Sequence, residues 1–190
     1  MTRPARLAAL SVLLPAVFAS SGSKQTAVFA GGCFWGVEAV FEHLRGVQSA
    51  TAGYATPEAD PKGFAEAVRV VYDPDRITYE QLLQVFFLVA HDPTQIDRQG
   101  PDVGPRYRSI VFVRGEADRQ IVRAALDSLR TSRVYAAPIA TEIAALGSFH
   151  IAEEFHQDFV MRHPDDAYVV VNDLPKLGEL RRRFPALYRE

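Results

Sequence analysis

Residues 26–45 read TAVFAGGCFWGVEAVFEHLR and place a short apolar strand directly before an amphipathic helix. The glycine pair Gly31 and Gly32 permits a tight turn between them, and apolar residues return after it at helical spacing. The only cysteine of the chain, Cys33, falls in the first turn of that helix or just before it. Unpaired backbone N–H groups and the helix dipole favour a thiolate there, so Cys33 is a candidate nucleophile. The alternative is a small buried core residue.

The composition is typical of a single globular domain. The 190 residues include 48% hydrophobic and 11% aromatic side chains, enough for one sizeable core, without a second compositional block. One domain over residues 22–190 is therefore expected. The formal net charge is −2 with no long run of either sign, so the sequence indicates neither nucleic acid nor an anionic membrane surface as a partner.

Residues 1–21 have the pattern of a cleaved secretory signal peptide. Arg3 and Arg6 precede an apolar run from Leu7 to Phe18, and small residues follow it. Because the run is too short for a membrane span, we expect an exported protein, periplasmic or extracellular, without a membrane anchor. A disordered apolar start of a cytoplasmic protein is the alternative. An unpaired thiol is unusual in an exported protein, and this indicates reactivity.

The order of predicted elements favours an α+β fold. A central series of strand, helix, strand, strand, helix and strand is typical of a ferredoxin-like split βαβ core, a two-layer sandwich, here with additional C-terminal helices. Thr78 and Gln81 form a capping box for one helix. The expected strands are 26–30, 48–54, 65–72, 109–113 and 138–144; the expected helices are 34–45, 78–91, 116–133, 151–162 and 174–184, with a long polar loop over 92–106.

A reactive thiolate needs a proton donor for the oxygen that it displaces. Glu66 lies among alanine and valine, and apolar surroundings raise the pKa of a carboxyl group. Asp102 and Tyr107 come from the long loop and the strand start after it, and Tyr54 adds a second neutral donor. Each also has a structural interpretation, which for Glu66 is a solubilising charge on an edge strand.

Two aromatic residues directly follow the thiol. Phe34 and Trp35 are expected to line the space that Cys33 faces, which favours an uncharged, apolar substrate group. Packing of Trp35 in the core is the alternative.

The histidines allow a rival mechanism. A Cys-His acyl hydrolase or transferase would pair Cys33 with His91, His150 or His156 and requires an imidazole within reach of the sulfur. A metal site is not indicated, because His150 and His156 are six residues apart and zinc-binding helices place histidines four apart. No glycine-rich phosphate loop indicates a bound cofactor either.

Together, several motifs in order from about residue 26 to 160 resemble the peptide methionine sulfoxide reductases of the A type. The nucleophile motif runs from Gly32 to Gly36 and is followed by Glu38 and Phe41. The other matching segments are Gly53-Tyr54, Ala65-Glu66-Ala67-Val68, Tyr72-Asp73-Pro74, His91-Asp92-Pro93-Thr94, Gln99-Gly100 with Asp102 and Gly104, Tyr107-Arg108-Ser109, and Ala152-Glu153 with His156-Gln157.

The resemblance implies a reaction and a set of roles. In this family a cysteine thiolate attacks the sulfur of methionine S-sulfoxide, free or in a protein, while a glutamic acid protonates the oxygen, leaving methionine and a cysteine sulfenic acid. Carried over, Cys33 is the nucleophile and Glu66 the acid. Tyr54 and Tyr107 donate to the oxygen and Asp102 gives polar support, while Phe34 and Trp35 hold the terminal methyl group. No metal, flavin or nicotinamide is implied.

This sequence departs from the family pattern in two regions. Phe64 stands where most members have histidine, and the loop over 55–63 is short, so access to the site differs. Many members also have one or two resolving cysteines near the C-terminus, whereas residues 168–176 contain none. The sulfenic acid must then be reduced by an external thiol, either thioredoxin-like, glutaredoxin-like or small.

The sequence thus predicts a single-cysteine, monomeric methionine-S-sulfoxide reductase that acts on oxidised proteins or free methionine sulfoxide. The enzymatic rival is the Cys-His hydrolase or transferase. The non-enzymatic rival is a domain that binds oxidised methionine without turnover.

Overall fold

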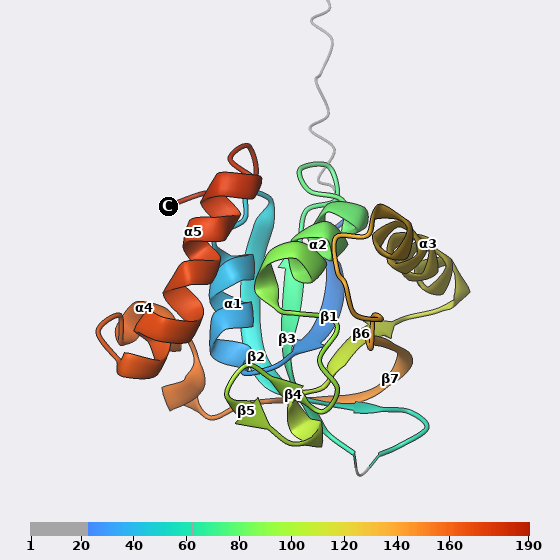
Figure 1. Cartoon of the computed structure of the whole chain (residues 1–190), viewed down its shortest axis with the longest axis horizontal. Coiled ribbons are helices and arrows are strands. Elements are labelled where there is room, and N and C mark those ends of the chain that lie inside the picture. The colour runs from blue at the N-terminus through green and yellow to red at the C-terminus, as the bar shows by residue number, and fades with distance from the viewer. Residues whose placement is uncertain (1–22, 62) are drawn as a thin grey trace, which may run out of the picture.

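A computed structural model describes residues 23–61 and 63–190, so the predicted signal peptide lies outside the described residues. Five strands form a mixed sheet in the order β1-β3-β2-β7-β6 that closes on itself, because β1 also pairs with β6 (Figure 1). All pairs are antiparallel except β6 with β7. The strands are β1 (Gln25–Gly31), β2 (Val47–Pro57), β3 (Ala65–Tyr72), β6 (Ser109–Val113) and β7 (Glu142–Ile151).

Side chains of β1 point alternately to the two faces of the sheet, so this strand contributes residues to two hydrophobic clusters. Phe29 points to the helices, where its ring stacks 5.0 Å from that of Phe41. Val28 and Ala30 point the other way, into the interior of the closed sheet. That interior is narrow, and it is filled largely by small side chains such as Ala55, Ala65 and Ala67.

The helices cover the outside of this sheet, and Figure 1 shows α1 and α5 side by side. The long amphipathic α3 lies against β6 and α2. The helices are α1 (Phe34–Glu42), α2 (Tyr79–Val85) with its π-helical continuation η1 (Phe86–Ala90), α3 (Glu116–Ser132), α4 (Phe159–Arg162) and α5 (Leu174–Arg183), with a further π-helical turn η4 (Val169–Asp173).

The capping box predicted for α2 is confirmed. The Thr78 hydroxyl accepts from the Gln81 backbone N–H at 3.2 Å, and the Gln81 side chain accepts from the Thr78 N–H at 2.9 Å. Two orphan donors at the helix start are thereby satisfied.

The ferredoxin-like description is not confirmed, although the α+β class is. The sheet closes through the pairing of β1 with β6, and this depends on strand register, which local periodicity does not reveal. The predicted loop over 92–106 contains two short paired strands, β4 (Arg98–Gln99) and β5 (Asp102–Val103), and a 3₁₀ turn, η2 (Pro105–Tyr107).

Two predicted elements near the C-terminus are wrong in position. The strand predicted over 138–144 is β7, which runs from Glu142 to Ile151 because it pairs with both β2 and β6. The helix predicted over 151–162 is replaced by a 3₁₀ turn, η3 (Glu154–His156), and the short α4. Asp158 separates them with a φ of 53°, in the left-handed region.

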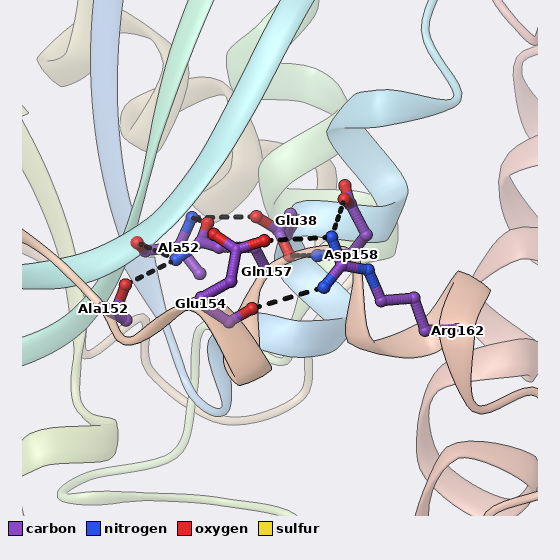
Figure 2. A network of polar contacts seen from close by, with 7 residues as sticks. All are labelled: Glu38, Ala52, Ala152, Glu154, Gln157, Asp158 and Arg162. Carbon is purple, nitrogen blue, oxygen red and sulfur yellow. Dashed lines mark hydrogen bonds and ion pairs between the residues drawn. The ribbon is translucent and has the colours of Figure 1, made fainter.

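Buried hydrogen bonds fix this interruption and hold α1 in place (Figure 2). The Glu38 carboxylate accepts from the backbone N–H of Ala52 on β2 at 2.8 Å and from that of Asp158 at 2.9 Å. The Gln157 amide donates to the carbonyls of Ala52 and Ala152. These contacts tie the helix that follows Cys33 to the sheet and to the C-terminal segment.

No helix within the described residues is long and apolar enough to cross a membrane.

Candidate active site

Cys33 lies where β1 ends and α1 begins, as the residue that precedes the first turn of the helix. Gly32 before it has a φ of +91°, which favours glycine, and a Cβ there would come within 2.4 Å of the Gln99 side chain. The turn therefore needs glycine both for its conformation and for its close approach to β4. It leaves Cys33 partly buried, next to Phe34, whose backbone N–H donates to Glu66 near the start of β3.

Glu66 lies on β3, next to the start of α1. Its side chain shares a strand face with Val68 and Val70, which pack against the helices. Its Oε2 accepts from the backbone N–H of Phe34 at 3.3 Å. Because β3 lies between β1 and β2, the interpretation of Glu66 as an edge-strand charge is wrong. Burial, with only 8% of the residue exposed, raises the pKa of Glu66 to about 7.

Tyr54 stands directly opposite Glu66 in the β2–β3 ladder. Its ring lies 5.7 Å from that of Phe34, and its hydroxyl donates to Oε2 of Glu153 at 3.2 Å. Burial first, and then the Glu153 carboxylate, raises the pKa of Tyr54 to about 12. Tyr54 is therefore a neutral donor beside the buried carboxyl group.

Asp102 and Tyr107 reach the site from β5 and η2. Burial and the charges of Glu66 and Asp102 raise the pKa of Tyr107, so this phenol is neutral as well. The Asp102 carboxylate accepts a hydrogen bond from the hydroxyl of Tyr168. The same hydroxyl lies close enough to Cys33 to lower the pKa of the thiol.

The two aromatic residues after the thiol form a wall with fixed geometry. Phe34 is buried between Tyr54 and His156. The Trp35 indole stacks on Phe159 with ring centroids 3.7 Å apart, and its Nε1 donates to Nδ1 of His156 at 3.1 Å. Trp35 is thus only partly in the core and is held rigidly beside Cys33.

The helix start favours the thiolate as expected, but burial outweighs its effect on the pKa of Cys33. Burial raises the pKa of Cys33 to about 12, and the carboxylates of Glu66 and Asp173 act in the same direction. The backbone N–H of Trp35 and the Tyr168 hydroxyl act against this increase without cancelling it. The resting site therefore holds a neutral thiol.

Two residues of the site were missed in the sequence, Tyr168 and Asp173. Asp173 is buried, with 1% exposed, and its Oδ1 pairs with Nζ of Lys176 at 3.0 Å. It packs on the first turn of α1 at Gly36, where a Cβ would lie 2.1 Å from Oδ1. In the sequence, residues 168–176 were notable only for their lack of cysteine, and no local pattern marks Tyr168 or Asp173 as site residues.

His91 and His156 form hydrogen bonds with other groups, and His150 lies on β7 opposite Tyr54. His91 is bound by the Phe86 carbonyl at 2.9 Å and the Ser109 hydroxyl at 2.7 Å, and burial lowers its pKa to about 4. His156 accepts from Trp35. Within residues 23–61 and 63–190, no imidazole is hydrogen-bonded to Cys33, and no group of three or more His, Cys, Asp or Glu side chains is arranged to hold a metal ion.

Comparison with known proteins points to one family. Residues 25–186 match the family described as peptide methionine sulfoxide reductase. Peptide methionine sulfoxide reductase MsrA 2 of Mesorhizobium japonicum is 47% identical over 182 residues, which cover 90% of this chain and 93% of that protein.

Solved structures agree. Reduced Mxr1 from Saccharomyces cerevisiae superposes with a TM-score of 0.68 at 31% identity, covering 75% of this chain and 87% of that one. Mxr1 has also been solved in complex with Trx2, and that chain superposes with a TM-score of 0.55 at 28% identity, covering 72% of this chain and 84% of that one.

Proposed function

The chain belongs to the peptide methionine sulfoxide reductase family, and from its geometry we propose how Cys33, Glu66 and their neighbours carry out the reaction. The protein is an enzyme that reduces methionine sulfoxide to methionine. The assignment of each step to a residue is our proposal, and it involves no bound cofactor.

The observation that carries the proposal is the hydrogen bond from the Phe34 N–H to Oε2 of Glu66. It holds a buried acid beside the first turn of α1, next to the Cys33 sulfur. With a pKa of about 7, Glu66 is half protonated near neutral pH and can donate a proton to the sulfoxide oxygen. Tyr107 adds a neutral donor to the same oxygen, and Tyr54 adds a second one when its hydroxyl turns from Glu153 to the substrate.

The raised pKa of the thiol determines the order of proton movements. Protonation of the sulfoxide oxygen by Glu66 makes the sulfoxide sulfur more electrophilic, so Cys33 attacks as its own proton leaves. The attack forms a bond between the two sulfur atoms, and the Glu66 carboxylate takes up the thiol proton. The protonated oxygen then moves from the methionine sulfur to the Cys33 sulfur, and the bond between the two sulfur atoms breaks, which releases methionine and leaves Cys33 as a sulfenic acid. Methionine sulfoxide is thereby reduced by two electrons, and the cysteine is oxidised by two.

The aromatic wall supplies the site for the methyl group. Phe34 and the rigidly stacked Trp35 present apolar surface beside Cys33, which suits the methyl carbon on the sulfoxide sulfur. The methyl group lies against this wall while the oxygen faces Glu66, and only one configuration at the sulfur then presents the sulfur to Cys33. This arrangement supports selection of the S-sulfoxide. The test is reduction of the two sulfoxide diastereomers of one peptide by the purified protein: reduction of the R form at an equal rate contradicts the proposal.

We further propose that an external thiol regenerates the enzyme. Cys33 is the only cysteine, so no internal disulfide can form. A first thiol condenses with the sulfenic acid to give a mixed disulfide and water, and a second thiol releases Cys33. The Mxr1 structure with Trx2 supports a thioredoxin-like donor. Turnover assays with thioredoxin, glutaredoxin and a small thiol discriminate the donors, and failure of all three beyond one turnover contradicts the scheme.

Location of the enzyme outside the cytoplasm is also a proposal. It rests on the signal-like sequence of residues 1–21, ahead of a reductase domain over residues 22–190. Cell fractionation with N-terminal sequencing of the mature protein tests it, and an intact residue 1 on cytoplasmic protein contradicts it.

A further inference from the structure

A second concave region lies next to the catalytic residues and is not explained by the chemistry at Cys33. It is a groove of about 1150 Å³ between the β2–β3 connection, η2, the start of β7 and α3. Its lining includes Phe64, Val103, Arg106 and Glu142.

Phe64 connects this groove to the catalytic site. Its ring, 40% exposed by residue, meets the ring of Tyr54 edge-on with centroids 5.6 Å apart. A smaller hollow of about 360 Å³ is lined by both Tyr54 and Phe64. Phe64 therefore lines both the groove and the hollow that includes Tyr54, and a polypeptide in the groove lies next to the catalytic site.

Arg106 covers Phe64 from the groove side. Its guanidinium carbon lies 5.5 Å from the centre of the Phe64 ring, within the range of a cation–π contact. It is also close enough to lower the pKa of Glu66 by its charge. The guanidinium is thus located at the boundary between the groove and the catalytic acid.

Arg106 differs from the other two arginines that line the groove. Arg108 pairs with Glu142 at 3.5 Å and donates to the Gly63 carbonyl at 2.7 Å. Arg119 pairs with Glu116 at 3.7 Å and donates to the Ile143 carbonyl. Among the residues that the structure describes, none forms a hydrogen bond or ion pair with the Arg106 guanidinium. Its donors are not used within the described part of the protein.

We propose that this groove holds the polypeptide next to an oxidised methionine and that Arg106 selects protein substrates with an acidic side chain close to that methionine. The inference rests on the proposed function and specifies its substrate class. A planar guanidinium whose donors are free can bind a carboxylate through two parallel hydrogen bonds. Because the site is exposed, we expect an effect on kcat/KM of about two- to fivefold for one acidic neighbour at low ionic strength.

The test compares three peptides of equal length that contain one methionine S-sulfoxide flanked on both sides by Asp, Ser or Lys. The expected order of kcat/KM is Asp over Ser over Lys, with most of the difference in KM. In Arg106→Gln the ratio between Asp and Lys peptides falls towards one. Any effect of the substitution on Glu66 changes all three peptides alike and cancels in this ratio.

Arg123→Gln is the matched control, because Arg123 is an exposed arginine of α3 that does not line the groove. It removes the same charge and is expected to keep the wild-type ratio. A wild-type ratio of one, a ratio unchanged by Arg106→Gln, or an equal loss in both variants overturns the inference. Reduction of free methionine S-sulfoxide is followed in parallel, so loss of the basic reaction is distinguished from loss of peptide selection.

Discussion

The carboxylate of Asp173 packs directly on Gly36, three residues after Cys33, so closely that a Cβ at Gly36 would lie 2.1 Å from Oδ1. The same carboxylate pairs with Lys176. The C-terminal segment around Asp173 thus packs against the first turn of α1, which follows Cys33. This close packing is possible because residue 36 is glycine and has no side chain.

Gly36→Ala is therefore expected to destabilise the protein and displace the C-terminal segment. The clash with buried Asp173 outweighs the gain in helix propensity, which is about 1 kcal/mol. Gly178→Ala, in α5, is the control, because nothing lies within 4 Å of a Cβ there. Thermal unfolding should show a lower Tm for Gly36→Ala and an unchanged or higher Tm for Gly178→Ala; a higher Tm for both contradicts the close packing.

Glu38→Gln should also lower stability. The carboxylate accepts two backbone N–H groups, from Ala52 and Asp158, whereas an amide has one acceptor oxygen. In the variant an amide NH2 group faces one of these two backbone donors, and the loss of that hydrogen bond costs about 1–3 kcal/mol, less if it falls on Ala52, whose N–H also donates to Oε1 of Gln157 at 3.0 Å. Chemical denaturation measures the loss, with the exposed Glu58→Gln as control. Equal stability of the two variants would show that these hydrogen bonds do not hold α1.

Glu66→Gln should slow the chemical step by about 10²–10⁴-fold, since the amide cannot supply a proton. The pKa of about 7 also fixes the pH dependence: the protonated form is active, so the wild-type rate falls as the pH rises through about 7. Single-turnover rates between pH 5 and about pH 9 test this. A wild-type rate that is independent of pH, or that Gln reproduces, removes Glu66 from the proton-donor role.

Asp173→Asn should make the Cys33 thiol easier to ionise. The carboxylate raises the thiol pKa by its charge, so its neutralisation lowers that pKa and speeds alkylation at neutral pH. The exposed Asp127→Asn, on α3, is the control. Alkylation rates against pH give the thiol pKa directly. A wild-type pKa well below the ordinary value for cysteine would contradict a neutral resting thiol.

Local patterns account for much of the fold. The bounds of β3 and β6 and the capping box at Thr78 follow from alternation and helix-start signals, which depend only on neighbours in sequence. The closed sheet and the position of β7 depend on pairing between distant strands. The broken helix near Asp158 depends on its bond to Glu38, 120 residues earlier, and no local pattern contains that information.

The candidate site divides in the same way. Sequence motifs predicted Cys33, Glu66 and Tyr54 as site residues. In the structure the β2–β3 register places Glu66 and Tyr54 opposite each other. Tyr168 reaches Cys33 and Asp102 only through the folded C-terminal segment. The raised pKa of the thiol was not predictable, because it results mainly from burial by that segment and the sheet, which outweighs the helix start.

The central claim is tested most directly by a single-turnover reaction of the reduced protein with a methionine S-sulfoxide peptide in the absence of any thiol donor. Mass spectrometry should find one methionine peptide formed per protein and one oxygen atom added to Cys33, and Cys33→Ser should form none. Methionine formation by Cys33→Ser, or by wild-type protein whose Cys33 remains an unmodified thiol, would contradict the account.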